Sequence, residues 1–191
     1  MFYDHTVYPF LVAFKKNVEV IAKEYLQATE NLDELKQFFS TDKMPPVYSH
    51  FDYWIRESGF DIGQIGYDAR GDKPVGGFPL FKKGFPIRWM DVQSIFPETY
   101  KLLMDVPNLH FAQFSIMSPQ AYILPHQHQV ESRIFHLNLL ALDGKAIFKA
   151  GDETLEYNKQ GDCFLFNPTH VHSSKNESTG YRTTLMFDFR I

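Results

Sequence analysis

The sequence predicts a mainly β fold, a sandwich or a barrel, with N-terminal helices packed on one face of the sheet. The 191-residue chain holds 19 Phe, 10 Tyr, 11 Gly and 11 Pro. This mixture of aromatic and turn-forming residues favours short strands joined by many turns. From residue 110 onward, apolar runs alternate with turn-forming segments at the spacing typical of all-β folds. The runs are HFAQFSIM, AYIL, RIFHLNLLAL, KAIFKA, TLEY, DCFLF and TTLMFDFR.

Helical patterns precede the β region. Apolar residues repeat at helix spacing after Asn17, the expected N-cap, and a second short helix is expected after Asn31. Pro97, at the first position of another apolar pattern, predicts a further short helix. Residues 47–95 carry Gly- and Pro-rich turn signals and indicate only short strands and loops.

These patterns predict one domain over residues 1–191. Its helical N-terminal segment covers 1–46 and ends near the prolines of STDKMPP, and its β core covers about 105–191. A chain of this length with 44% hydrophobic residues can bury a sizeable single core.

Charge and cysteine content narrow the partners. The formal net charge of -4 gives no basic surface for nucleic acid or for an anionic membrane. No stretch approaches the eighteen or so apolar residues of a membrane-spanning helix. Cys163 is the single cysteine, so no disulfide can form within the chain, which fits a reducing compartment. We therefore expect a cytoplasmic protein with no nucleic-acid or membrane partner.

Histidines gather where metal chemistry would need them. Six of the eight lie between residues 110 and 172, including the pairs His126-Gln-His128 and His170-Val-His172. Residues two apart in a strand share a face, so each pair can direct two imidazoles at one point. Neutral imidazole is a suitable ligand for iron(II), and an open mononuclear site needs only two or three protein ligands. One histidine in a sheet is usually a packed, hydrogen-bonded residue, but two pairs favour a metal site.

Arg182 follows His172 by ten residues, at the start of the last apolar run. Its guanidinium could hold a dicarboxylate through two parallel hydrogen bonds. Taken alone, an arginine at a strand end is more often a surface residue.

Several segments, in order, resemble the aspartyl/asparaginyl β-hydroxylases, a branch of the iron- and 2-oxoglutarate-dependent oxygenases. FSIMSPQAYILPHQHQ is similar to that family's Ser-Ile-Met-x-Pro-Gly followed by Pro-His, and RIFHLNL to its Met-His-Leu-Gly-Leu strand. GDCFLFNPTHVHSSKNESTGYRTTLMFD is similar to its Gly-x-x-x-x-Phe-Asp, distal His and Arg, and FPETYKLL to an element before the core. The resemblance covers about residues 90–190. It implies a double-stranded β-helix, the cupin-like jelly roll.

The resemblance assigns roles to matching residues. His126 and His172 match the proximal and distal iron ligands. Arg182 and Ser115 match residues that hold the far carboxylate of 2-oxoglutarate. His136 matches a family histidine that lies near the other end of 2-oxoglutarate, the end that binds iron. A further family arginine is replaced by Ile134. Arg133, one place away, should point to the other face of its strand.

His128 departs from the pattern. Many 2-oxoglutarate oxygenases carry Asp two positions after the proximal histidine, whereas this branch often has a small residue there. Three alternatives are open. His128 could be a third iron ligand, could hydrogen-bond an iron-bound water, or could turn away.

The function that the resemblance implies is hydroxylation of a C–H bond with dioxygen, at the β-carbon of an Asp or Asn that is free, carrier-bound or in a peptide. No catalytic side chain beyond the metal ligands is then required. Arg56, Arg70 and Arg88 could meet a substrate carboxylate. Two alternatives are a three-His cupin dioxygenase that does not use 2-oxoglutarate and a non-catalytic metal-binding cupin module.

Overall fold

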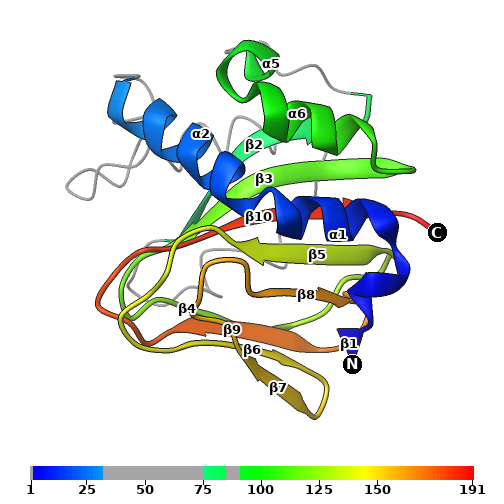
Figure 1. The fold of residues 1–191 in the computed structure, drawn as a ribbon. Coiled ribbons are helices and arrows are strands. Elements are labelled where there is room, and N and C mark those ends of the chain that lie inside the picture. Colours follow the sequence, from blue (N-terminus) through cyan, green and yellow to red (C-terminus); the bar gives the residue numbers. More distant parts are fainter. Residues whose placement is uncertain (1, 32–74, 85–90) are drawn as a thin grey trace.

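The computed structural model describes residues 2–31, 75–84 and 91–191, which form two antiparallel sheets that face each other, with helices along one side (Figure 1). The six-stranded sheet has the order β1 (Phe2–Tyr3), β8 (Cys163–Phe166), β5 (Arg133–Asn138), β10 (Arg182–Phe189), β3 (Leu109–Met117) and β2 (Val75–Lys82). The four-stranded sheet has the order β4 (Tyr122–His126), β9 (His172–Asn176), β6 (Ala146–Ala150) and β7 (Glu153–Glu156). The predicted mainly β, jelly-roll fold is confirmed.

The helices lie mainly before the β core. They are the 3-10 turn η1 (His5–Val7), α1 (Pro9–Lys16), α2 (Val18–Asn31), α5 (Val92–Ile95) and α6 (Pro97–Met104). The prediction that a helix starts at Pro97 is confirmed. The second helix expected after Asn31, and the end of the helical segment near residue 46, lie outside the described residues. Within them, no helix is long and apolar enough to cross a membrane.

Asn17 stands in the predicted N-cap position of α2, but its side chain does not cap that helix. Its side-chain amide donates a 2.9 Å hydrogen bond back to the carbonyl of Ala13, so it closes the C-terminal end of α1. Its own carbonyl accepts from the backbone N–H of Ile21 and thereby starts the hydrogen bonding of α2. Asn17 thus lies at the junction of two helices. Its side chain caps the C-terminal end of α1, and its backbone carbonyl starts α2.

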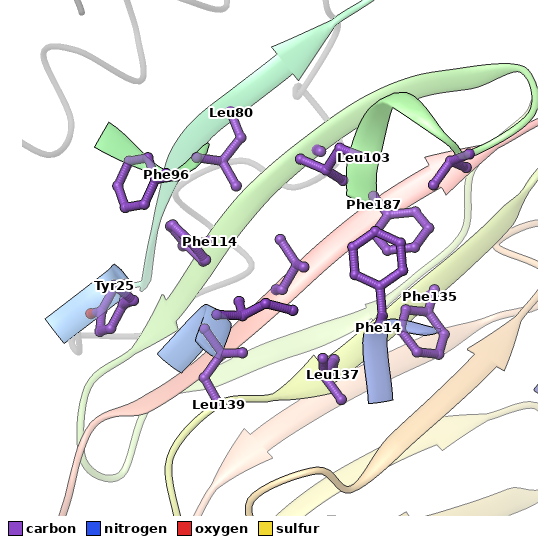
Figure 2. Close-up of a cluster of buried hydrophobic side chains, with 14 of the residues drawn as sticks. Phe14, Tyr25, Leu80, Phe96, Leu103, Phe114, Phe135, Leu137, Leu139 and Phe187 are labelled. Carbon is purple, nitrogen blue, oxygen red and sulfur yellow. The ribbon is translucent and has the colours of Figure 1, made fainter. Parts of the chain in front are cut away.

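The outer face of the six-stranded sheet packs against the helices (Figure 2). Phe14 of α1 is fully buried, and its ring centroid lies 4.7 Å from that of Phe187 in β10. Tyr25 of α2 packs edge-on against Phe114 of β3, with 5.1 Å between ring centroids. Each fully buried Phe contributes about 1.5–3 kcal/mol through removal of apolar surface from water. The helices therefore cover one face of the sheet, as predicted.

A carboxylate connects α2 to α6. Glu24 accepts hydrogen bonds from the backbone N–H groups of Glu98 and Thr99, over 2.8 and 3.0 Å, and from the Thr99 hydroxyl over 2.6 Å. The residue at the N-cap position of α6, Phe96, makes no side-chain cap. Glu24 therefore supplies the missing cap from another helix, and its negative charge suits the positive end of the helix dipole.

The smaller sheet contains a strand that the sequence did not predict. β9, with the sequence HSSKN, lies between β4 and β6 and carries the buried residues His172, Ser174 and Asn176 at alternate positions. In addition, β1 and β2 come from before residue 105 and widen the larger sheet on its two edges. The inner face of the jelly roll is thus built from a longer part of the chain than the predicted core.

Candidate metal centre

Three histidines meet where the smaller sheet ends. His126 closes β4 and His172 opens β9, and the two are register partners across the strand pair. His128 lies two residues beyond β4, where its backbone N–H donates to the carbonyl of Pro168 over 2.8 Å. The ligand atoms of the three side chains lie within 4.8 Å of one another. The structure therefore brings together the three histidines that the sequence offered as candidate metal ligands.

Backbone carbonyls orient two of the rings. The Nδ1 of His126 donates to the carbonyl of Leu124 over 2.8 Å, and the Nδ1 of His172 donates to the carbonyl of His170 over 2.9 Å. A carbonyl only accepts, so the ring proton lies on Nδ1, and each Nε2 keeps a free lone pair. Such a second hydrogen bond is typical of metal-binding histidines.

The third ring has a nitrogen without a partner. Nε2 of His128 is buried and has no hydrogen bond among the described residues. Burial, together with the neighbouring charge of His126, lowers the pKa of His128 to about 4, although Asp188 acts in the opposite direction. Burial also lowers the pKa of His172 to about 3, and the hydrogen bond to the His170 carbonyl offsets only part of that shift. Both rings are neutral at pH 7, so their lone pairs are available to a cation.

This donor set fits a divalent transition metal. Three imidazoles whose nitrogens lie close together suit iron(II) and zinc, and a cation would satisfy the otherwise unpaired Nε2 of His128. The cluster contains no carboxylate from the described residues. A bound metal would then keep its full positive charge and attract anionic ligands.

Arg182 lies in the interior rather than on the surface. Only 1% of its surface is exposed, and its guanidinium donates to the hydroxyls of Tyr157 and Ser174, the latter over 2.6 Å. Its Nε has no hydrogen-bond partner, and no carboxylate of the described residues pairs with it. A buried, uncompensated cation is costly in a protein. The arrangement therefore suits an anionic ligand.

The other two residues assigned to 2-oxoglutarate lie near Arg182 on the same inner face. Ser115 of β3 is the register partner of Thr184 in β10, one diagonal step from Arg182. His136 is buried, stacks on Phe164 with 4.9 Å between centroids, and has its Nδ1 3.4 Å from the Thr184 hydroxyl. Burial, and then the charge of Arg182, hold the pKa of His136 well below its ordinary value. His136 is consequently neutral between the arginine and the three histidines.

The remaining candidates lie elsewhere. Arg133 points away from the interior, with its guanidinium 4.2 Å from the centre of the Tyr3 ring. Ile134, in contrast, is buried in the inner cluster. His170 is outside the group of three and contributes only its carbonyl, which orients His172. The candidate substrate arginines Arg56, Arg70 and Arg88 lie outside the described residues.

The sequence did not reveal the two partners of Arg182. Ser174 could have been found from the two-residue period, because it shares a strand face with His172. Tyr157 follows β7 and has no distinguishing pattern.

Comparisons with solved structures find matches of low similarity. A predicted oxalate decarboxylase from Thermotoga maritima shares 18% identity, with 44% of this chain and 69% of that chain covered and a TM-score of 0.37. A cupin domain from Schizosaccharomyces pombe shares 13% identity over 61% of this chain and 65% of its own, with a TM-score of 0.43. A Cupin 2 conserved barrel domain protein from Salinispora arenicola shares 14% identity over 63% of this chain and 80% of its own, with a TM-score of 0.38.

A search of curated proteins found no match. The sequence model of a single family, described as aspartyl/asparaginyl beta-hydroxylase, matches residues 15–191. This match begins in α1 and so extends well before the segment near residue 90 where the resemblance was first visible. Since it spans nearly the whole chain, the protein belongs to the aspartyl/asparaginyl β-hydroxylase family.

Proposed function

We propose that the protein is an iron(II)- and 2-oxoglutarate-dependent hydroxylase whose target is the β-carbon of an Asp or Asn. The observation that carries this proposal is the buried guanidinium of Arg182, which has no carboxylate partner among the described residues. It donates to Ser174, two residues from His172 on the same strand face. The membership of a hydroxylase family supports it.

His126, His128 and His172 would hold the iron through their Nε2 atoms. When bound, iron(II) and 2-oxoglutarate supply the chemistry that inserts one oxygen atom of dioxygen into a C–H bond while 2-oxoglutarate becomes succinate and carbon dioxide. Three imidazoles on one side of a metal leave its other positions open to co-substrate and dioxygen. No side chain needs to act as an acid or base toward the C–H group.

The other interior residues would bind and orient the co-substrate. Arg182 can pair with its far carboxylate, and the hydroxyl of Ser115 can add a hydrogen bond to the same group. Tyr157 and Ser174 hold the guanidinium in one orientation before any ligand arrives. Neutral His136 lies where it can donate to a carboxylate without adding charge.

Aromatic side chains limit the access of water to this region. The ring of Phe166 lies 4.9 Å from that of His172, and Phe148 stacks on His172 at 5.9 Å. Phe164 covers one face of His136. A dry interior strengthens the interaction between Arg182 and an anion, and it limits side reactions.

A cupin dioxygenase with three histidines and no 2-oxoglutarate is the second candidate. This candidate is favoured because the metal cluster of the described residues consists of three histidines and no carboxylate. It gives no reason for a buried arginine that has no counterion within residues 2–31, 75–84 and 91–191, whereas a dicarboxylate co-substrate does. A non-catalytic metal-binding module is the third candidate, and it predicts metal binding without turnover.

The test is succinate formation from 2-oxoglutarate by the iron(II)-loaded protein, with L-aspartate and L-asparagine supplied as candidate substrates. The proposal expects turnover in the wild type and its loss in Arg182→Met, while iron binding is retained. Arg190→Met, a change of the same kind at an exposed position, is the control. Iron binding by a wild-type protein that has no affinity for 2-oxoglutarate would reject the proposal in favour of one of the two alternatives.

A further inference from the structure

A second group of polar side chains lies on the inner face, outside the residues discussed so far. Asp188 of β10 pairs in register with Ile134 of β5, which pairs with Phe166 of β8. Phe166 in turn packs on His172, with 4.9 Å between ring centroids, so the cross-strand row that contains Asp188 ends against the metal cluster. The charge of Asp188 is also among those that act on His128. Asp188 is therefore close enough to the three histidines for its charge to act on one of them.

A β-bulge places His110 beside Asp188. The register between β10 and β3 shifts so that Asp188 faces Phe111 and Phe189 faces Leu109, which leaves His110 as the extra residue. Its Nδ1 lies 3.4 Å from Oδ1 of Asp188, yet the two atoms form no hydrogen bond. Bulges of this kind commonly redirect a side chain next to a functional site.

Gln113 supplies a second acceptor in the next row. The residue is 9% exposed, its amide oxygen is buried without a partner, and its amide nitrogen has only a 4.0 Å contact with the sulfur of Met186. The amide lies against Gly77, where an added Cβ would be 2.1 Å from the Gln113 oxygen. The absence of a side chain at Gly77 thus creates the space that this amide occupies.

Two of the three unsatisfied atoms in this group can only accept hydrogen bonds, whereas Nδ1 of His110 can donate or accept. Oδ1 of Asp188 and Oε1 of Gln113 are both hydrogen-bond acceptors, and both are buried without a donor among the described residues. Unpaired buried acceptors are unfavourable, so a ligand with several N–H donors would be stabilised here. The charge of Asp188 also acts on the buried ammonium of Lys82, although Oδ1 accepts no hydrogen bond from it. A carboxylate beside a neutral amide oxygen favours a cationic donor over a neutral one.

We propose that Asp188 and Gln113 form a substrate subsite that binds a protonated primary amine, such as the α-amino group of an amino acid. This inference rests on the proposed function for the identity of the substrate, and it goes beyond that function by assigning the group that is recognised. The subsite positions the substrate and takes no part in the reaction at the metal.

The test compares L-asparagine with N-acetyl-L-asparagine, which lacks the charged amine, by calorimetric titration into protein loaded with Mn(II) and 2-oxoglutarate. The wild type is expected to bind L-asparagine about tenfold more tightly or better, the size of a charge-assisted hydrogen bond. Asp188→Asn should remove this preference, and Gln113→Met should weaken it. Asp143→Asn, the same change at an exposed loop position, should leave it intact.

Equal binding of the two probes by the wild type, or an unchanged preference in Asp188→Asn, would overturn the inference. Gln113→Met keeps the test decisive if Asp188→Asn does not fold. Asparaginyl-glycine, added as a third probe, distinguishes a free amino acid from the N-terminus of a peptide, and tight binding of either supports the amine subsite.

Succinate formation in the same samples separates this inference from the proposed function. If L-asparagine binds more tightly than N-acetyl-L-asparagine but no succinate is formed, the proposed function fails and the subsite stands. Succinate formation without discrimination means that only the subsite fails.

Discussion

Arg182 on β10 and Ser174 on β9 are joined by a hydrogen bond of 2.6 Å between Nη1 and Oγ. The two strands belong to different sheets, so the bond crosses the interior of the jelly roll. The Ser174 hydroxyl also lies 3.1 Å from that of Tyr157, the second acceptor of the guanidinium. The cation is therefore held in place by two neutral groups, and a ligand that binds it need not order it first.

Replacing Arg182 with Met is expected to change the stability of the ligand-free protein by less than about 1 kcal/mol, or to raise it, because a buried charge is removed that has no counterion in the part of the chain that the structure describes. Tyr157 and Ser174 can still bond to each other. The rise in Tm on adding 2-oxoglutarate, about 5–10 °C for the wild type at a hundredfold excess over Kd, should disappear. Thermal unfolding with and without ligand measures both effects. A loss of several kcal/mol without ligand would instead make Arg182 a structural residue.

His128→Ala is expected to weaken binding of iron(II) or zinc by about 10-fold to 100-fold or more, because it removes one of three nitrogens that lie within 4.8 Å of one another. His170→Ala is the matched control, since only the backbone carbonyl of His170 contacts the group. Competition with a chromogenic chelator gives the affinities. Equal affinities in wild type and His128→Ala would restrict the ligands to His126 and His172.

Glu24→Ala is expected to lower the free energy of unfolding by about 2–3 kcal/mol, because it removes a charged acceptor of three hydrogen bonds at the start of α6. Urea denaturation measures the change. Glu19→Ala removes the same charge from an exposed position on the same helix and should cost far less. Equal effects of the two substitutions would show that the cap has no special role.

Cys163 should react slowly in the folded protein. Burial raises the pKa of its thiol above the ordinary value, and Lys15 offsets this only in part. The thiolate is the reactive form, so at pH 7–8 alkylation by iodoacetamide should be slower than in urea, and the difference should narrow as the pH rises through the raised pKa. Because the pKa of Cys163 is higher in the folded protein, this residue lowers the free energy of unfolding once the pH exceeds the pKa of the unfolded thiol. Mass spectrometry of the single cysteine reports the rates, and faster labelling of the folded protein would contradict the expectation.

The sequence predicted the elements whose side chains follow a hydrophobic pattern. β3, β5, β6, β8 and β10 correspond to apolar runs, because their residues are buried between the sheets or beneath the helices. The start of α6 was predictable because proline is favoured at the first position of a helix. The spacing of the histidines indicated a metal cluster for a similarly local reason, since the strand period places neighbours on one face.

β9 escaped prediction because its inward residues are polar. His172 belongs to the metal cluster, Ser174 orients Arg182, and Asn176 donates to three carbonyls of the loops next to it. Sequence rules are expected to fail where a strand lines a functional site instead of a hydrophobic core. β1 was missed for a simpler reason, because a strand of two residues has no period.

The burial of Arg182 and the location of Asp188 could not be predicted either. Charged residues in strands are usually exposed, so Arg182 alone suggested a surface position. Its environment depends on Tyr157 and Ser174, which are 25 and eight residues away in the chain. Asp188 lay unnoticed within an apolar run, and only the register with β3 and β5 shows which side chains it faces.

Substitutions on the two faces of β10 should also have different consequences for the protein. Leu185 and Phe187 point to the helices, while Thr184, Met186 and Asp188 point to the interior of the jelly roll. Substitutions on the helix side, at the odd-numbered positions, should therefore reduce protein abundance. Substitutions on the interior side, at the even-numbered positions, should leave abundance normal and alter ligand binding or catalysis. Evolution could then retune the substrate of such an enzyme along one side of a single strand while the other side preserves its foldability.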